Sequence, residues 1–328
     1  MSPRLTALHA RMVAAVLALA FVTVALLVGV WLVFFALFIA VDPGGAAGFA
    51  TLFTAFTLVV IGYLEYSHLE TIERFADATP VAPSDEPELY RTVTKVAALL
   101  SVPVPMVALA DRDAPEAMAV GFRSETVHLV LSRGTLEALE TADELEAVIA
   151  HELAHVRNRD AMVMTAVSTP VVLAGGLRSR IESMEEPGVL ILIVGPLWFV
   201  SSALWVVGRT ITARLSRARE RVADRAAAEA TGSPAALASA LRRLDGEIAD
   251  TPNRDLRAVS GVSSLSILPL EPRELEKVML GPRGDVEPSF WWLRKRLHRL
   301  ERRLFGSHPP TEERLAALSS LERERSGR

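Results

Sequence analysis

Four stretches without a charged side chain constrain the fold most strongly, at residues 12–41, 43–64, 161–177 and 187–208. About 20 mainly apolar residues cross a bilayer as a helix, so the first, second and fourth stretches are long enough. The third is borderline, because it is short and contains hydroxyl side chains and a proline; a buried helix of a catalytic domain is the alternative there. We therefore expect an α-helical membrane protein with four spans.

The first stretch has a second interpretation, as part of a cleaved signal peptide over residues 1–41. Its apolar run is about twice the usual length of about 7 to 15 residues, so we interpret it as a retained membrane anchor.

Arginines next to the spans indicate the orientation. Arg4 and Arg11 precede the first span and a group of arginines follows the fourth, whereas the first hairpin, near Asp42, has no basic residue. The positive-inside rule then places the N-terminus, residues 65–160 and everything after residue 208 in the cytoplasm. Arg178 and Arg180, between the third and fourth spans, argue against this arrangement.

The pattern H-E-x-x-H at residues 151–155 indicates a catalytic metal site. His151 and His155 are four apart in a run that is typical of a helix, so both can bind one metal ion. Glu152 lies beside that pair, where it can take a proton from a water on the metal. The alternative is an accidental match in an alanine-rich helix, but residues 143–157 contain no glycine or proline and carry an apolar stripe.

A catalytic zinc ion usually has three protein ligands, and the best candidate for the third is Glu220. Glu220 and Asp224 share one face of a second predicted helix, a spacing that suits a ligand and a group that holds a ligand histidine. Acids among arginines are also typical of a solvated helix face. Spacing alone therefore leaves other acidic residues as candidates: Asp160, Glu185, Glu186 and Glu229.

Composition excludes some classes of site and partner. The chain has no cysteine, so a disulfide or a thiolate zinc site is impossible and the metal must rely on histidine and carboxylate. The formal net charge of −4 gives no reason to expect nucleic acid as a partner.

A small α/β unit is predicted between the second span and the HELAH sequence. Residues 87–100 form a helix in this prediction, and residues 106–110, 117–121 and 127–131 form short strands. If the second strand is an edge strand beside the metal, an extended substrate can pair with its backbone. The alternative is an ordinary core strand.

The C-terminal part holds two further features. Trp291 and Trp292 open a segment with a leucine stripe surrounded by basic residues, which is typical either of a helix on an anionic membrane surface or of one packed on the catalytic domain. Later, Thr311 is expected to cap a helix whose first turn holds Glu312 and Glu313.

A family resemblance covers nearly the whole chain. The sequences PEAMAVG at 115–121, DELEAVIAHELAHVRNRD at 143–160, SRARERVADRAAAEATG at 216–232 and HPPTEERLAAL at 308–318 resemble the HtpX membrane-bound metalloproteases, relatives of the CAAX prenyl proteases. The resemblance implies one zinc ion held by His151, His155 and Glu220, with Glu152 as the base. It also implies a place near the substrate or the site for His308 and Arg314. Glu116 departs from the family, which usually has asparagine there.

The expected protein is therefore an integral-membrane, zinc-dependent endopeptidase of gluzincin type with a small β-sheet beside the active-site helix. Its parts are a transmembrane hairpin (1–64), the first part of a cytoplasmic peptidase domain (65–160), a second hairpin (161–208) and the rest of the peptidase domain (209–328). Misfolded or membrane proteins are the expected substrates, as the resemblance suggests, and Asp224 is expected to support a zinc ligand. Residues expected to contact substrate are Glu116, Ala117, Met118, Ala119, His308 and Arg314. A prenyl-CAAX-type protease and an inactive zinc-containing scaffold are the alternatives, and the oligomeric state is not predicted.

Overall fold

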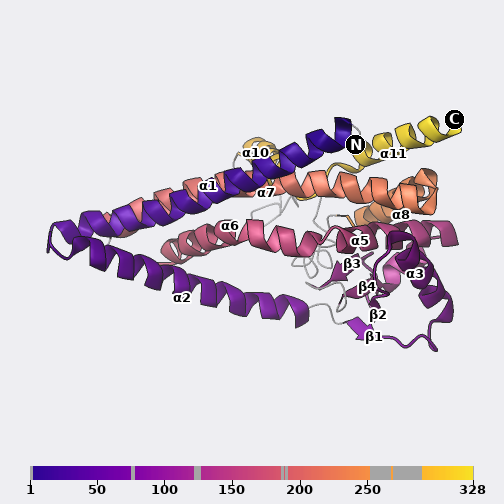
Figure 1. Ribbon diagram of the computed structural model, residues 1–328, viewed down its shortest axis with the longest axis horizontal. Coiled ribbons are helices and arrows are strands. Elements are labelled where there is room, and N and C mark those ends of the chain that lie inside the picture. The colour runs from indigo at the N-terminus through magenta and orange to yellow at the C-terminus, as the bar shows by residue number, and fades with distance from the viewer. Residues whose placement is uncertain are drawn as a thin grey trace, which may run out of the picture. The chain divides into compact units, whose positions relative to one another are not determined.

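The structure is a computed structural model that describes residues 3–74, 78–121, 127–185, 188, 191–251, 267–268 and 290–327. Most of the described chain is helical (Figure 1). The chain divides into two compact units. Unit 1 comprises residues 1–75 and 163–215, and unit 2 comprises residues 76–162 and 216–328.

Unit 1 consists of long apolar helices. Helix α1 (Pro3–Ile39) and helix α2 (Ala46–Arg74) form a helical hairpin, and the unit also contains most of α6 (Asp160–Glu182) and the first part of α7 (Ile191–Thr231) (Figure 1). Among the described residues, three helices are long and apolar enough to cross a membrane: α1, α6 and α7. The apolar run of α2, Ala46–Val60, is shorter.

Small residues let these helices approach closely. A Cβ atom added at Gly29 of α1 would lie 2.7 Å from Val200 Cγ1 of α7, and one added at Gly208 would lie 2.7 Å from Val171 Cγ2 of α6. Close backbone approach at glycine is a usual way for helices to associate in a bilayer, where burial of apolar surface gives little driving force. The glycines thus suit unit 1 to a membrane environment.

Unit 2 contains a four-stranded mixed sheet with the order β1-β2-β4-β3. The strands are β1 (Ala78–Pro80), β2 (Met106–Ala110), β3 (Ala117–Val120) and β4 (His128–Ser132). Strand β2 pairs with β1 antiparallel and with β4 parallel, and β4 pairs with β3 antiparallel. Strand β3 is therefore at an edge of the sheet, as the expected substrate pairing requires.

Helix α5 (Ala142–Arg157) carries the HELAH sequence and packs beside β3. Its start is fixed by a capping box, in which Glu144 N donates to Thr141 Oγ1 and Thr141 N donates to Glu144 Oε2. The helix ends at Arg157 with Asn158 as its C-cap, and Arg159 then adopts a left-handed conformation with φ of 55° before α6 begins at Asp160.

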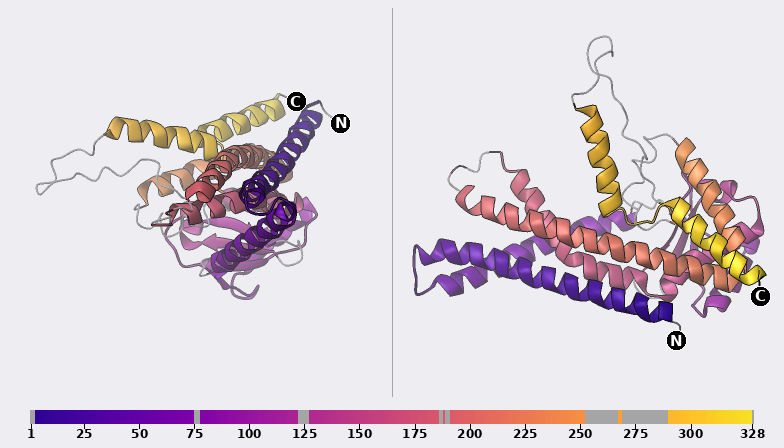
Figure 2. Two further views of the ribbon diagram at one scale, coloured as in Figure 1. Left: turned by 90° about the vertical axis from the view of Figure 1, so that its left-hand side faces the viewer. Right: turned by 90° about the horizontal axis from the view of Figure 1, so that it is seen from above.

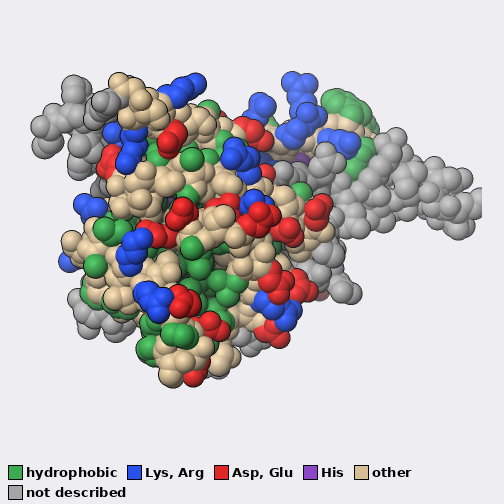
Figure 3. All heavy atoms as spheres, turned by 90° about the vertical axis from the view of Figure 1, so that its right-hand side faces the viewer, with side chains coloured by type: hydrophobic (Ala, Val, Ile, Leu, Met, Phe, Trp, Pro, Cys, Tyr) green, Lys and Arg blue, Asp and Glu red, His purple; other side chains and the backbone are tan. Residues whose placement is uncertain are grey.

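The remaining helices of unit 2 surround α5. Helix α3 (Pro87–Leu100) and helix α8 (Pro234–Asp250) pack against α5, and α11 (Thr311–Ser326) packs against α8. Short α4 (Arg133–Ala138) follows β4, and α10 (Trp291–Phe305) precedes α11. Figure 2 shows these helices from two further sides, and Figure 3 shows acidic and basic side chains interspersed on one face.

The expected fold class, a mainly helical membrane protein with a small sheet beside the HELAH helix, is confirmed. Helix 87–100 and strand 106–110 have the predicted bounds, whereas β1 was not predicted. The cap prediction was wrong: Pro310 precedes the first residue of α11, and the Thr311 hydroxyl donates to Asp245 Oδ1 at 3.0 Å. Because the side chain bonds to α8, it is not available to cap its own helix.

Candidate metal centre

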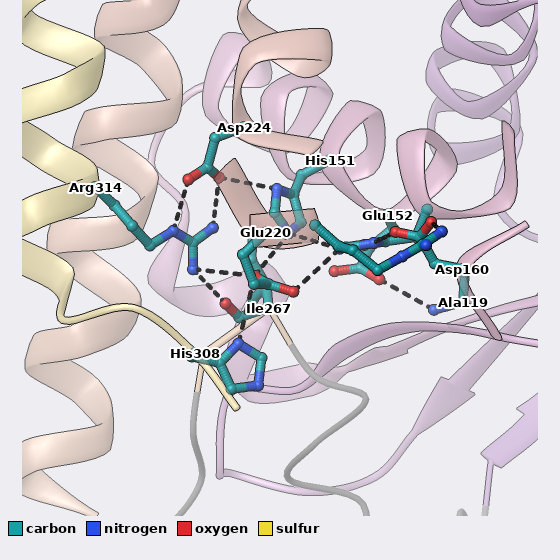
Figure 4. Close-up of polar contacts among 11 residues, drawn as sticks. Ala119, His151, Glu152, Asp160, Glu220, Asp224, Ile267, His308 and Arg314 are labelled. Carbon is teal, nitrogen blue, oxygen red and sulfur yellow. Dashed lines mark hydrogen bonds and ion pairs between the residues drawn. The ribbon is translucent and has the colours of Figure 1, made fainter. Parts of the chain in front are cut away.

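Two helices bring three potential metal ligands together in unit 2. His151 and His155 lie on α5, one turn apart, and Glu220 lies on α7. The Nε2 atoms of the histidines are 3.2 Å apart. Glu220 Oε1 is 3.3 Å from His155 Nε2, and Glu220 Oε2 is 3.5 Å from His151 Nε2. These three residues form a group that can hold one metal ion, and Figure 4 labels two of them, His151 and Glu220.

The separations fit a tetrahedral zinc site. Two ligand atoms at zinc–ligand distances of about 2.0 to 2.1 Å are separated by about 3.4 Å in that geometry. The two Nε2 atoms are close to this separation, as is each Nε2 from the nearer Glu220 oxygen, and one ligand atom from each residue lies within 4.8 Å of the others. Two histidines and one carboxylate are also a ligand set known for catalytic zinc. The residues present therefore fit this ion.

Each histidine has a carboxylate at its other ring nitrogen. Asp224 Oδ1 lies 3.0 Å from His151 Nδ1, and Asp160 Oδ2 lies 2.6 Å from His155 Nδ1. Of the two neutral tautomers of a histidine, a carboxylate beside Nδ1 favours the one with the proton on Nδ1. The lone pair is then on Nε2. Both lone pairs then face the Glu220 carboxylate, and three electron-rich groups directed at one point favour a cation between them.

Each of these carboxylates also forms an ion pair with an arginine. Arg314, on α11, donates to Asp224 through Nε at 2.9 Å and Nη2 at 2.6 Å, in the bidentate arrangement typical of strong pairs. Arg219, on α7, forms an ion pair with Asp160 and donates to Asn158 O at 3.2 Å. All four side chains are buried, so each charge is balanced where water cannot solvate it.

Glu152 lies between the metal-ligand group and the sheet. Its Oε2 accepts a hydrogen bond of 3.1 Å from Ala119 N of β3. Its Oε1 is buried and has no hydrogen-bond partner among the described residues. Burial raises the pKa of the Glu152 carboxyl to about 7, although the neighbouring His151 and His155 lower it. The carboxyl is thus poised to accept and release a proton near neutral pH.

The outer edge of β3, the edge away from β4, adjoins this carboxyl. Ala119 N points to Glu152, and Ala117 O accepts a hydrogen bond of 3.0 Å from Ile267 N. Ile267 is itself held at its carbonyl, which accepts from Arg314 Nη1 at 2.6 Å. Two main-chain groups of this edge are therefore already engaged, one by Ile267 and one by Glu152, and pairing of an extended substrate with the edge stays a prediction.

Glu116 is buried just before β3. Its Oε1 lies 3.3 Å from Arg112 Nη1, and its main-chain N donates to Ser132 Oγ at 2.7 Å. Burial raises the pKa of the Glu116 carboxyl, and the ion pair with Arg112 opposes that rise. Contact of this side chain with a bound peptide stays a prediction.

His308 and Arg314, which only the resemblance indicated, both lie at the site. His308 Nδ1 is 3.3 Å from Glu220 Oε2, and Arg314 Nη1 is 3.7 Å from the same oxygen (Figure 4). A role for either residue in binding substrate stays a prediction.

The other candidates for the third ligand lie elsewhere. Asp160 faces His155 from the opposite side of the ring, Glu229 is exposed and pairs with Arg225, and Glu185 is exposed in unit 1. Glu186 lies outside the described residues.

Sequence reasoning missed the contact of Asp160 with His155 and the pairing of Arg219 with Asp160. In the sequence, Arg219 is only one of several arginines around Glu220, and nothing distinguishes it from the others. Asp160 lies five residues after His155, a spacing that does not place two side chains together on a helix. The left-handed Arg159 makes the contact possible, and nothing in the sequence marks that residue.

The fold and the site together define a membrane-bound metalloprotease, and residues 83–322 match the model of peptidase family M48. The chain belongs to peptidase family M48. It is 33% identical to "Protease HtpX homolog 2" of Methanosarcina acetivorans over 75% of this chain and 76% of that protein. It is 32% identical to "Protease HtpX homolog" of Moorella thermoacetica over 82% of this chain and 83% of that protein. The resemblance to the HtpX proteases is confirmed.

The chain is also similar to a solved structure, the crystal structure of S. mikatae Ste24p. The match has a TM-score of 0.46 at 18% identity, covers 88% of this chain and spans 61% of that chain.

Proposed function

We propose that the protein is an integral-membrane zinc endopeptidase of gluzincin type, with His151, His155 and Glu220 as the metal ligands. The mutual distances of 3.2 to 3.5 Å among the three ligand groups carry this proposal. The carboxylates at both Nδ1 atoms support it further, because they direct the Nε2 lone pairs towards one point.

A zinc ion held there supplies Lewis acidity, which polarises a scissile carbonyl and acidifies a water molecule. Glu152 supplies the base. Its Oε1 accepts the proton of the attacking water, while Ala119 N holds Oε2 and so fixes the orientation of the carboxyl. The same group then donates the proton to the leaving amine.

The substrate peptide binds as an extended strand beside the outer edge of β3, the edge away from β4. Ala117, Met118 and Ala119 supply the backbone of that edge, and Ala117 O already accepts a hydrogen bond there. Main-chain pairing tolerates many sequences, which suits an enzyme that acts on unfolded segments. His308 is placed to donate to the substrate or to Glu220, and Arg314 holds Asp224.

We further propose that misfolded or membrane proteins are the substrates, in membrane-protein quality control, and that the peptidase domain faces the cytoplasm. The resemblance to the HtpX proteases supports the first point, and the arginines that follow the last span support the second. An inactive scaffold is disfavoured, since a structural metal site gives no reason for a buried carboxyl beside the ligands with one oxygen that has no partner in the described part of the chain.

Substitution of the proposed base tests this function. Glu152→Gln should keep zinc, because it removes no ligand, and should abolish cleavage of unfolded casein, because the amide cannot accept the proton. Metal content and casein turnover are measured on the same purified full-length preparation, with and without a chelator.

Glu146→Gln is the matched control. Glu146 lies on the same helix but pairs with Lys95, so this variant should keep both zinc and activity. Chelator-insensitive cleavage by the wild type, or cleavage by Glu152→Gln at the wild-type rate, would refute the proposed function.

A further inference from the structure

Helix α10 leaves its apolar side chains uncovered. None of its residues is buried, and the exposed fractions are 66% for Trp292, 54% for Leu297 and 50% for Leu300. Phe290, immediately before the helix, is 70% exposed. Among the described residues, therefore, the apolar side of α10 does not pack into the core of the peptidase unit.

The helix is amphipathic, and its charge is almost all of one sign. Leu293, Leu297, Leu300 and Leu304 follow one another at intervals of three and four and so form one stripe. The sequence WWLRKRLHRLERRLF contains six basic side chains and one acidic side chain. Helical geometry places Arg296 and Arg303 on one side of the stripe and Arg294 on the other. In Figure 3, Lys and Arg side chains gather beside apolar side chains at the upper right of the face shown.

We propose that α10 is a surface-binding helix that lies on an anionic phospholipid bilayer, with its leucine stripe among the acyl chains and its basic residues at the headgroups. Charge complementarity supports this partner, because a basic side chain near an anionic leaflet contributes roughly 1 kcal/mol. Arginines beside an apolar stripe extend their charged ends to the headgroup level while their stems stay with the lipid.

The rest of the chain makes this partner available. The described part of the chain has three helices suited to crossing a membrane, so unit 2 is always tethered to a bilayer. Tethering raises the effective concentration of that surface and allows a helix of modest intrinsic affinity to bind. A nucleic acid would use the basic residues but would leave the leucine stripe in water.

A site-specific label tests the proposal without any measurement of proteolysis. The chain contains no cysteine, so Leu297→Cys gives one attachment point for an environment-sensitive dye. Arg299→Cys, on the opposite side of the same helix, is the matched control. Each full-length variant is placed in nanodiscs of phosphatidylcholine alone and of phosphatidylcholine with phosphatidylglycerol.

The dye at position 297 should shift to shorter emission wavelength and lose most of its quenching by acrylamide in the anionic discs. The dye at position 299 should stay quenched in both lipids. High salt should restore part of the quenching at position 297, because exposed charges are screened.

Equal quenching at position 297 in both lipids, whether high or low, would overturn the proposal. Strong quenching in both would mean that the stripe stays in water. Protection in both would mean that it is covered without anionic lipid, by protein or by neutral lipid. Protection that appears only when RNA or another protein is added would assign the surface to a different partner.

Discussion

Each histidine of the HELAH helix is the inner member of a chain of three side chains. His151 is followed by Asp224 and Arg314, and His155 is followed by Asp160 and Arg219. An unpaired carboxylate at either buried position would cost several kcal/mol, so the arginines stabilise the negative charges that orient the imidazoles. We infer that Arg219 and Arg314 are part of the structural support of the metal centre, although neither needs to contact the metal.

The ligand assignment predicts different metal affinities for two acids on one helix face. Glu220→Ala should lose zinc almost completely, since it removes a ligand. Asp224→Asn should lower the affinity by about 10 to 100-fold, because it removes only the charge that supports His151. Asparagine is preferable to alanine at position 224, because it keeps an oxygen opposite Arg314. A competition titration with a chromophoric chelator measures the zinc affinities of the two variants. Equal affinities would show that Glu220 is not the ligand.

Position 116 gives a prediction about specificity. Glu116 is paired with Arg112, so Glu116→Asn removes a negative charge and leaves the guanidinium uncompensated by that carboxylate. Cleavage of peptides that are acidic at the facing subsite should therefore rise relative to basic ones, with zinc content unchanged.

Paired acidic and basic peptides, compared at low and high salt, measure this ratio, and the difference should shrink as salt screens the charge. Arg112→Gln is the control and should change the ratio in the opposite direction. An unaltered ratio at low salt would place position 116 away from the substrate.

At the scale of elements, the start of α4, the short helix between β4 and α5, is packed tightly around Gly134. Gly134 N donates to Arg112 O at 2.9 Å, and a Cβ atom at this position would lie 1.9 Å from Asp113 O. The neighbouring backbone must move to accept any side chain here. This contact holds α4 against the segment that leads into β3, and so fixes the strand that borders Glu152.

Gly134→Ala should therefore destabilise the protein by about 1–3 kcal/mol or more. Gly246→Ala, in α8, is the matched control, because nothing lies within 4 Å of its added Cβ. Because position 246 lies within a helix, Gly246→Ala should stabilise the protein by roughly 0.5–1 kcal/mol. Thermal unfolding of both variants in one detergent tests the pair, and similar melting temperatures would contradict the packing argument.

Local patterns predicted the elements well, and long-range contacts poorly. The HELAH helix, α3 and the three longer strands follow from residue patterns that lie within each segment. Strand β1 has only three residues, too few for a periodic signal. The contacts of Arg314 with Asp224 and of Ile267 with Ala117 join residues far apart in the chain, which no pattern within one segment can indicate.

At the scale of the whole molecule, the arrangement across the membrane remains a prediction. Four spans with cytoplasmic ends require the segment between α6 and α7 to lie outside, although it begins near Arg178 and Arg180. Both arginines are engaged within unit 1: Arg178 pairs with Glu182 and lies over the Trp205 ring, and Arg180 donates to Gly176 O. Because these contacts hold both side chains close to the helices, the two charges are compatible with an external turn.

Single cysteines in this cysteine-free chain test that arrangement in intact cells. Gly44→Cys and Ser183→Cys, both at exposed turns, should react with a membrane-impermeant maleimide added outside. Ser84→Cys, Arg225→Cys and Ser326→Cys are equally exposed in the structure but should react only after lysis, because the positive-inside rule places unit 2 in the cytoplasm. Reaction of any of these three cysteines with maleimide added outside would show that the predicted orientation is wrong. Protection of Ser183→Cys until lysis would show that α6 and α7 do not cross as a hairpin, and the chain would then have two spans instead of four.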